Sequence, residues 1–450
     1  MNAATELHPD AQNIDLRAWW MPFTHNRYFK QKPRLITRAK GAYYELADGR
    51  RVFDCLSGLW CSPLGHSHPT VVKAVQEQVE TLDFAPSFQM GHPAGFTLAT
   101  RIAALAGRPN DSVFFVNSGS ESVDTAIKIA VAYHRMRGDA ARTRIIGRER
   151  GYHGVGLGGI SVGGIPANRK MFSSLMIPGV DHLPHTWNPE QMRYSKGQPT
   201  WGAHLADELE RIVALHDAST IAAVIVEPMQ GSTGVIVPPK GYLEKLREIC
   251  TKHGILLIFD EVITGFGRLG TPFSSGYFGV QPDLITFAKA VNNATVPLGG
   301  VIVREDIQQA FMTGPAHAIE FFHGYTYSGH PLAVAAAHAT LDVLEDEKLI
   351  ERAAKLAPVL EKAIHTLQGE PHVTDIRNIG LAGAIELVPY AGQPGMKAIR
   401  VFEQSLNEGQ MPRFSGDILA VAPPFISTEA EVLEMVEGLR RALRATPAAL

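Results

Sequence analysis

Six short apolar runs recur between residues 113 and 304, and a helix-length segment separates most of them from the next. Within each run the apolar residues are consecutive rather than alternating, which is typical of strands buried on both faces. Such strands occur in mainly parallel sheets that helices cover on both sides. The sequence therefore predicts an α/β fold with strands at 113–117, 144–149, 222–227, 255–261, 284–288 and 299–304.

The two ends of the chain differ from this central region and predict a second structural unit. The first residues are polar and have no periodicity, and a hairpin pattern that turns at Asp48-Gly49 follows them. Pro331 begins a strong helix pattern that leads into the C-terminal part. We expect a loose arm at 1–16, a large domain at 70–335, and a smaller α+β domain built from 17–69 and 336–450.

Composition excludes several classes of protein. The 42 basic and 45 acidic residues leave a net charge of -3, which gives no electrostatic footprint for nucleic acid or an anionic membrane. Three cysteines are too few for a disulfide framework and suit a reducing compartment. The start of the chain lacks a secretory signal, and no apolar stretch reaches the ~18 residues of a membrane span. We expect a cytoplasmic protein without nucleic-acid or membrane partners.

Ligands in open α/β sheets bind beyond the carboxyl ends of the strands, so polar residues at those ends are the candidate functional residues. Asp260 and Glu261 end the almost wholly apolar run ILLIFDE. A carboxylate removed from water normally has a partner. That partner is either a set of backbone amides in a loop or, in the functional interpretation, the cationic nitrogen of a cofactor.

Two further strand ends carry ionisable side chains. Lys289 follows the run LITFA, where a lysine is rarely accommodated without purpose. It either extends to the surface or is a Schiff-base lysine that desolvation keeps nucleophilic. Glu227 ends the run AAVIVE and, taken alone, is better explained as a structural carboxylate.

A fourth strand end, VFFVNSGSES, passes into a helix through small residues. Free backbone amides at a helix start can bind a phosphate, and the alternative is a plain capping box of Ser118 and Glu121. A phosphate cradle, an acidic group and a nucleophilic amine together match the needs of pyridoxal 5′-phosphate. That cofactor is held through its phosphate and an imine to lysine, and its ring nitrogen needs a nearby carboxylate.

The motifs SGSES, GYHG, VEPMQG, IFDEVITGFGR, FAK and HGYTYSGHP resemble those of the class III aminotransferases, which are fold-type-I pyridoxal-phosphate enzymes. WWMPFTHNR and SGLWCSPLGHSHP are similar to the ω-amino acid–pyruvate (β-alanine–pyruvate) group in particular. IFDEVITGFGR with a lysine 29 positions after its Asp is the most specific element of a resemblance that spans about 17 to 445. It implies transamination from an ω-amino acid such as β-alanine, or a related amine, to pyruvate.

The resemblance also implies roles for individual residues. Lys289 matches the imine lysine, Asp260 the partner of the pyridine nitrogen, and Arg413 the arginine that receives a substrate carboxylate. Thr326 matches a position that reaches the phosphate of the neighbouring subunit, which implies an obligate homodimer and leaves a homotetramer open. The other matched residues are Gly119 and Ser120 at the phosphate, Tyr152 and Val262 at the cofactor ring, Glu227 near the active site, and Trp60 and Phe23 as walls of the substrate pocket.

Several alternatives remain open. Taurine, 4-aminobutyrate, polyamines or aryl-alkyl amines are alternative donors on the same scaffold, as is a decarboxylase or racemase activity. A non-enzymatic protein that retains the fold is a further alternative, although it would have no physical need for Lys289, Asp260 and Arg413. Many relatives have a glycine-rich run after the lysine, whereas this chain has AVNNATVPLGG, so the conformation of that loop is not predicted.

Two other patterns predict no additional ligand. Gly154, Gly156 and Gly159 satisfy GxGxxG, but they follow a His-Gly loop rather than a strand, which argues against a dinucleotide site. His66 and His68 lie in a Gly/Pro loop with no third ligand nearby, so we expect no metal site.

Overall fold

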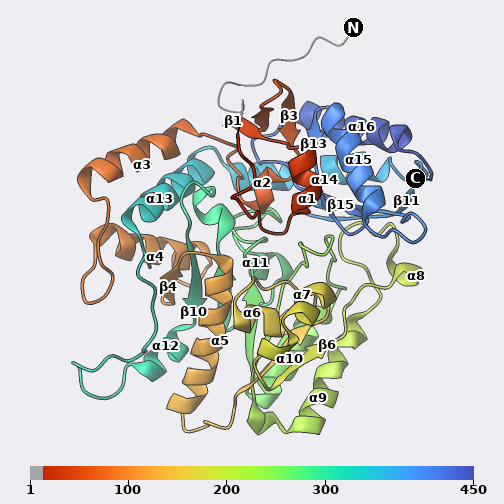
Figure 1. Ribbon diagram of the computed structural model, residues 1–450. Coiled ribbons are helices and arrows are strands. Elements are labelled where there is room, and N and C mark those ends of the chain that lie inside the picture. The colour runs from red at the N-terminus through yellow and green to blue at the C-terminus, as the bar shows by residue number, and fades with distance from the viewer. Residues whose placement is uncertain (1–13, 450) are drawn as a thin grey trace.

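The computed structural model describes residues 14–449, which contain three β-sheets (Figure 1). The largest sheet has seven strands in the order β4-β10-β9-β8-β7-β5-β6. The strands from β9 to β6 run parallel, and β10 is antiparallel to both of its neighbours. The strands are β4 (Ser112–Val116), β10 (Gly299–Val303), β9 (Leu284–Phe287), β8 (Leu256–Asp260), β7 (Ile221–Val226), β5 (Arg144–Arg148) and β6 (Val180–Leu183).

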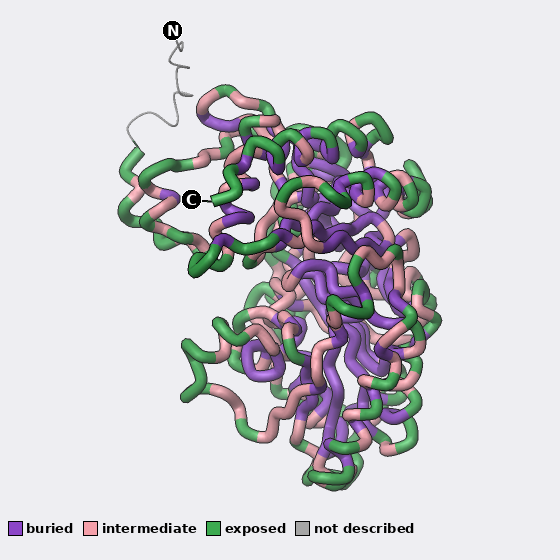
Figure 2. Tube along the Cα trace, turned by 90° about the vertical axis from the view of Figure 1, so that its right-hand side faces the viewer, coloured by how far each residue is buried: buried purple, intermediate pink, exposed green. Residues whose placement is uncertain are grey.

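The predicted strands of the large sheet share a short apolar run, and most of them are buried. Every position of β7, β8, β9 and β10 is buried, and Figure 2 shows buried backbone through the interior of this part of the molecule. The sequence did not predict β6, the edge strand with the sequence VDHL, which is mostly half-buried and contains no apolar run. The predicted α/β fold with a mainly parallel sheet is confirmed.

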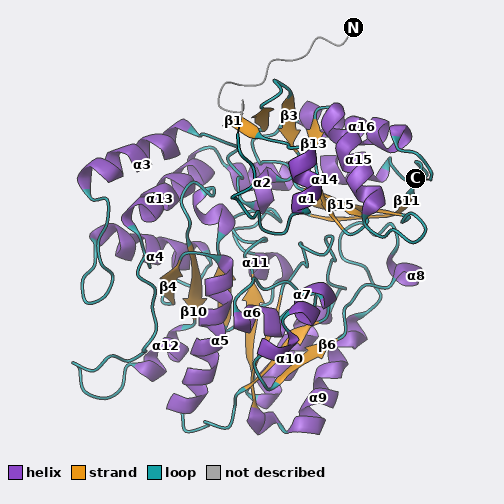
Figure 3. Ribbon diagram, viewed as in Figure 1, coloured by secondary structure: helices purple, strands orange, loops and turns teal. Residues whose placement is uncertain are grey.

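Helices cover both faces of the large sheet (Figure 3). The helix α5 (Gly119–Met136) packs apolar residues on one face, and α9 (Glu208–His216) with α10 (Tyr242–His253) on the other. Within residues 14–449, no helix is both long enough and apolar enough to cross a bilayer. The other helices of this part are α3 (Pro69–Thr81), α4 (Pro93–Leu105), α6 (Leu157–Val162), α7 (Pro166–Met171), α8 (Pro189–Met192), α11 (Ser274–Phe278), α12 (Glu305–Phe311) and the short 3₁₀ turns η2 (Ser173–Leu175), η3 (Ala203–Asp207), η4 (Ala218–Thr220) and η5 (Lys289–Asn292).

The two ends of the chain share a second sheet, in the order β1-β2-β3-β13. The predicted hairpin is present, because β2 and β3 pair in antiparallel fashion around the turn that contains Gly49. The strand β13 then pairs in parallel with β3, so the red and blue ends of the ribbon lie together in Figure 1. Residues 1–13 of the expected arm lie outside the described residues. The elements are α1 (Asn26–Gln31), β1 (Ile36–Lys40), β2 (Tyr43–Leu46), β3 (Arg51–Asp54), α2 (Ser57–Trp60) and β13 (Gln410–Met411).

The third sheet belongs to the C-terminal part and has the order β11-β12-β15-β14. The helix α13 begins at Pro331, as the sequence predicted, and its buried residues share one apolar core with the large sheet and with α14 and α16. The smaller sheets are therefore packed onto the large sheet through a shared apolar core. The elements are α13 (Pro331–Asp346), α14 (Leu349–His365), β11 (Val373–Ile379), β12 (Ala382–Leu387), α15 (Met396–Asn407), β14 (Arg413–Ser415), β15 (Ile418–Val421) and α16 (Glu429–Ala445).

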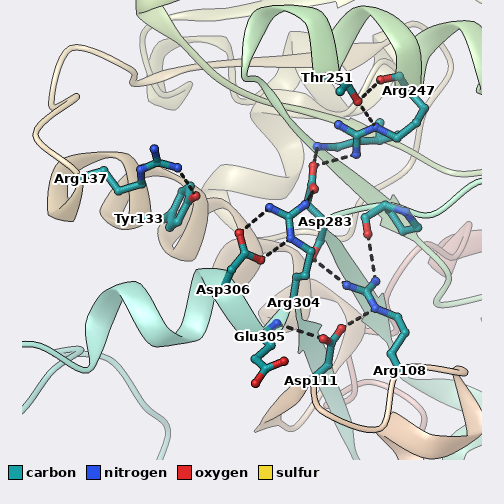
Figure 4. Close-up of polar contacts among 12 residues, drawn as sticks. Arg108, Asp111, Tyr133, Arg137, Arg247, Thr251, Asp283, Arg304, Glu305 and Asp306 are labelled. Atoms are coloured by element: carbon teal, nitrogen blue, oxygen red, sulfur yellow. Dashed lines mark hydrogen bonds and ion pairs between the residues drawn. The ribbon is translucent and has the colours of Figure 1, made fainter.

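An ion-pair cluster closes the edge of the large sheet at which its parallel strands begin (Figure 4). The buried Asp283 accepts a hydrogen bond from a backbone amide of β8 (2.6 Å) and one from Arg247 Nη1 (2.9 Å), and it forms an ion pair with Arg304. Arg142 donates to the carbonyl of His253 (3.2 Å), the last residue of α10. Arginines suit this edge because helix C-termini carry partial negative charge. The cluster thus stabilises the fold at the edge opposite the candidate functional residues.

Candidate active site

A pocket of about 170 Å³ lies where β7, β8 and β9 end and α5 begins. Glu227 follows β7, Asp260 ends β8 and Lys289 follows β9, so neighbouring parallel strands bring the three side chains to one edge of the sheet. Of the residues predicted to bind the cofactor, Thr326 alone is absent from the lining. The lining residues are Gly119, Ser120, Tyr152, His153, Gly154, Glu227, Asp260, Val262, Ile263 and Lys289.

The Asp260 carboxylate is buried and held by three hydrogen bonds. One oxygen accepts from Thr286 Oγ1 (3.1 Å) and from the backbone amide of Val262 (3.2 Å). The other lies 2.7 Å from His153 Nδ1. Within residues 14–449, the buried Nε2 of His153 has no partner. These neighbours fix the orientation of the carboxylate, and a fixed carboxylate in a buried site can hold a proton on a bound heterocycle.

The backbone at Lys289 is held in an unusual conformation. Lys289, Asn293 and Ala294 have φ of 50°, 56° and 57°, a region that costs a non-glycine residue roughly 1–3 kcal/mol. The loop that the sequence left unpredicted begins as the 3₁₀ turn η5. Asn293 then anchors it, because its side chain accepts from the amide of Leu64 (3.0 Å) and donates to the carbonyl of Gly65 (2.7 Å). The Asn293 side chain therefore ties the loop after Lys289 to the Leu64-Gly65 segment.

Burial shifts the proton affinities of the pocket residues. It lowers the pKa of Lys289, and the charge of Asp260 opposes that shift. Burial also raises the pKa of Glu227 to about 7. The charge of His153 lowers this pKa, and the charge of Asp260 raises it further. Glu227 Oε1 accepts from the Tyr152 amide (2.8 Å), so this carboxyl group also anchors the loop after β5. The pocket thus contains an amine that releases its proton more readily than a surface lysine and a carboxyl group that ionises near neutral pH.

The start of α5 forms one wall of the pocket. Ser118 caps the helix by accepting from the amide of Glu121 (3.2 Å), while the Glu121 carboxylate accepts from the amide of Asn117 (2.7 Å). A Cβ on Gly119 would lie 2.9 Å from Val262 Cγ1, so glycine permits the close approach of this helix to the loop after β8. The helix is 18 residues long, and its N-cap Ser118 engages the amide of Glu121. The other backbone amides at this N-terminus form a site suited to a phosphate.

The glycine series after β5 packs against the same helix. Gly154 has φ of 85°, and a Cβ there would overlap Ser120. A Cβ on Gly156 would overlap Asp124, whose carboxylate accepts from the amide of Gly159 (2.8 Å). These glycines therefore allow one loop to lie directly on α5.

Two of the residues predicted to form the substrate pocket are placed very differently. Trp60 is 1% exposed and belongs to an apolar cluster with Met229 and Ile263, the latter a lining residue. Phe23 is 75% exposed, and its ring centre is 6.4 Å from that of Tyr152 in an edge-on arrangement. Both aromatic side chains therefore lie near the pocket residues without lining the pocket itself.

Arg413 lies on β14 and is half-buried. Burial lowers its pKa, and its charge acts on the pocket residues Tyr152 and Lys289, although Arg413 is not itself a lining residue. No carboxylate of residues 14–449 lies within 4.0 Å of it. Thr326 is exposed, in a loop whose neighbours Phe322 and Tyr327 are exposed as well.

The sequence interpretation missed His153, and it chose Asp260 rather than Glu261 through the family resemblance alone. The Glu261 carboxylate turns away from the pocket and accepts from the amides of Ser274 and Ser275 (2.9 Å) at the start of α11. Successive residues of a strand point to opposite faces, so one of the two had to face away. No local pattern marks His153, because it reaches Asp260 from the loop after β5, a strand that β7 separates from β8.

Comparisons with known proteins agree with the resemblance seen in the sequence. Residues 25–443 match the model of the family described as aminotransferase class-III. The chain is 56% identical to an omega-aminotransferase of Caulobacter vibrioides (97% of this chain, 99% of the relative) and 50% identical to a beta-alanine–pyruvate aminotransferase of Pseudomonas aeruginosa (97% of each). A PLP-bound amine transaminase from an uncultivated Pseudomonas species superposes with a TM-score of 0.88 at 35% identity, over 96% of this chain and 99% of that one. The chain belongs to the class III aminotransferase family.

Proposed function

We propose that the protein is a pyridoxal 5′-phosphate-dependent aminotransferase that moves the amino group of an ω-amino acid such as β-alanine to pyruvate, giving malonate semialdehyde and L-alanine. The observation that carries the proposal is the convergence of Lys289, Asp260 and the start of α5 on one pocket. The names of the relatives at 50% and 56% identity support the ω-amino donor and the pyruvate acceptor. Taurine, 4-aminobutyrate, polyamines and aryl-alkyl amines remain the alternative donors.

The residues of the pocket fit this cofactor. When bound, it supplies an electron sink for the bond that breaks at the substrate carbon. Gly119 and Ser120 would hold its phosphate at the start of α5, with Thr326 of the neighbouring subunit at the same group. Tyr152 and Val262 would enclose its ring, and Glu227 would anchor the Tyr152 loop. The buried Nε2 of His153, which has no partner within residues 14–449, would be free to bond a polar group of the cofactor.

Asp260 and Lys289 would have different tasks in the reaction. The Asp260 carboxylate would keep a proton on the ring nitrogen, which its three hydrogen bonds orient it to do. Lys289 Nζ would hold the cofactor covalently, and later take up and return the proton of the substrate carbon. Burial favours this second role, because it lowers the pKa of Nζ and so makes the free amine more accessible.

Arg413 is proposed to bind the carboxylate of pyruvate and to withdraw when an amine donor has none. The support is a half-buried guanidinium whose charge acts on Tyr152 and Lys289 and which has no carboxylate partner within residues 14–449. Trp60 and Phe23 are proposed as the walls that contact the uncharged part of the substrate. A charged contact that can move lets one pocket accept two unlike substrates in turn.

We further propose a cytoplasmic homodimer, with a homotetramer as the alternative. Large apolar side chains on the Thr326 side of the molecule support a subunit interface, since such patches mark association sites. The exposed fractions there include 60% for Phe88, 73% for Phe96 and 87% for Phe322. Each subunit is proposed to consist of a large domain at 70–335 and a small domain from 17–69 and 336–450, which the pairing of β3 with β13 supports.

A donor panel with pyruvate as the fixed acceptor tests the proposed reaction. The holoenzyme should form alanine from β-alanine, and the Arg413→Ala variant should lose activity toward pyruvate more than toward an acceptor without a carboxylate. Equal losses for both acceptors would contradict the role of Arg413. Failure to form alanine from β-alanine, with turnover of another donor, would replace β-alanine by that donor.

A further inference from the structure

The register of the C-terminal sheet places two arginines in one row. Arg377 lies opposite Ala384, Ala384 opposite Ala420, and Ala420 opposite Arg413. Directly paired residues of an antiparallel sheet point to the same face, so the two guanidinium groups project from the same side. With strands about 4.8 Å apart, the two backbones are about 14 Å apart. The row thus runs from Arg377 on one edge strand to Arg413 on the other.

Arg377 is the fixed end of this row. It is 1% exposed and bonds Asp375 (2.5 Å) and Glu386 (2.6 Å) within its own sheet. Its Nε donates to the carbonyl of Gly234 (2.8 Å), and its guanidinium stacks on Trp187 at 4.3 Å from the ring centre. Arg377 therefore joins the C-terminal sheet to two loops of the large sheet.

One of these loops leads directly to the pocket. The loop 230–236 is closed by an antiparallel bridge between Gln230 and Ile236. Its Gly231 amide donates to Glu227 Oε2 (3.3 Å), which lines the pocket. Between the two arginines, Ala384 and Ala420 share an apolar cluster with residues of the loop and of the pocket wall. The loop therefore contacts the C-terminal sheet at Arg377 and the pocket at Glu227.

We propose that Arg377 is a positioning residue that fixes where the Arg413 guanidinium stands relative to the pocket. This inference rests on the proposed function, because it takes Arg413 as the contact for the carboxylate of pyruvate. Loosening the fixed end allows the sheet to shift against the loop, and the edge strand with Arg413 shifts with it. Binding of a substrate carboxylate should suffer, whereas the groups that move protons lie on the large sheet and should be unaffected.

The test compares pyruvate with butanal as acceptors, with β-alanine as the common donor. Arg377→Met should raise the KM for pyruvate about tenfold, with kcat and the KM for butanal within about twofold of the wild type. Arg377→Lys should raise the KM for pyruvate less than Arg377→Met does, but still above the wild-type value, because lysine lacks the planar guanidinium of arginine. The control is Arg440→Gln, which breaks an ion pair with Glu370 elsewhere in the C-terminal part and should leave the KM ratio unchanged.

A double-mutant cycle separates positioning from a general loss of stability. In the Arg413→Ala background, the Arg377 substitution should cause no further rise in the KM for pyruvate. If Arg377→Met does not fold, Glu386→Gln weakens the same anchor and serves in its place. Parallel changes in both KM values, or an undiminished effect in the Arg413→Ala background, would overturn the role of Arg377. A wild type that converts neither acceptor would overturn the proposed function and this inference together.

Discussion

Asp260 and Glu261 are adjacent buried carboxylates with different surroundings. Asp260 faces the pocket and contacts His153 and Thr286, whereas Glu261 accepts backbone amides at the start of α11. Of these two adjacent residues at the end of β8, one is therefore proposed for chemistry and the other is structural.

Replacement of the pocket carboxylate should slow chemistry without unfolding the protein. Asp260→Asn keeps the shape of the side chain but loses its charge, so we expect the half-reaction with β-alanine to slow by about 10²–10³. The absorbance change of the bound cofactor measures that rate. Glu261→Gln is the matched control and should lower the melting temperature with little effect on the rate. Similar rates for Asp260→Asn and the wild type would contradict the role of Asp260.

The raised pKa of Glu227 predicts a pH-dependent stability. The native state keeps this proton up to about pH 7, whereas the unfolded chain releases it near the ordinary value of 4.5. The native state therefore binds more protons in this window, and the free energy of unfolding falls as pH rises through it, by about 3 kcal/mol in total. Glu227→Gln cannot ionise at this position, so the variant should lack this pH-dependent fall in the free energy of unfolding.

Melting of the cofactor-free protein at pH 5 and pH 8 measures the effect. The melting temperature of Glu227→Gln relative to the wild type should be higher at pH 8 than at pH 5. A difference that does not change between the two pH values would show that Glu227 ionises alike in the native and unfolded chains.

Among the helices and strands, the ion-pair cluster around Asp283 joins β8, β9, α10 and the end of β10. Asp283→Asn leaves Arg247 and Arg304 without their shared anion, and breaking a buried pair costs about 3–5 kcal/mol. Denaturant unfolding should show this loss, while the KM for pyruvate stays unchanged. Asp306→Asn removes the exposed partner of Arg304 and should cost less than about 1 kcal/mol. Equal losses in the two variants would contradict a central role for Asp283.

The buried strands could be predicted from sequence because each one is a continuous apolar run between the loops. The edge strand β6 could not, since its sequence VDHL mixes polar and apolar residues and contains no apolar run. The pairing of β13 with β3 joins residues more than 350 positions apart, and no local pattern encodes such a contact. In the site, Asp260 and Lys289 stood out as charges at the ends of apolar runs. His153 and the anchors of Asn293 depend on tertiary contacts between loops, which a single sequence does not specify.

For the molecule as a whole, the proposed dimer predicts that cofactor retention depends on protein concentration. If Thr326 of one subunit reaches the phosphate bound by the other, dilution to monomers should release the cofactor. Sedimentation with absorbance detection follows both the mass and the cofactor band. Thr326→Ala should release cofactor at a higher protein concentration than the wild type. A monomer that retains its full cofactor absorbance would contradict a shared site.

The covalent attachment of the cofactor to Lys289 is the claim on which the proposed chemistry depends. Borohydride reduction of the cofactor-saturated enzyme, followed by peptide mass mapping, locates the attachment directly. We predict a single pyridoxyl adduct on Lys289 and its loss in Lys289→Ala. An adduct on another lysine, or none at all in the saturated protein, would contradict the account.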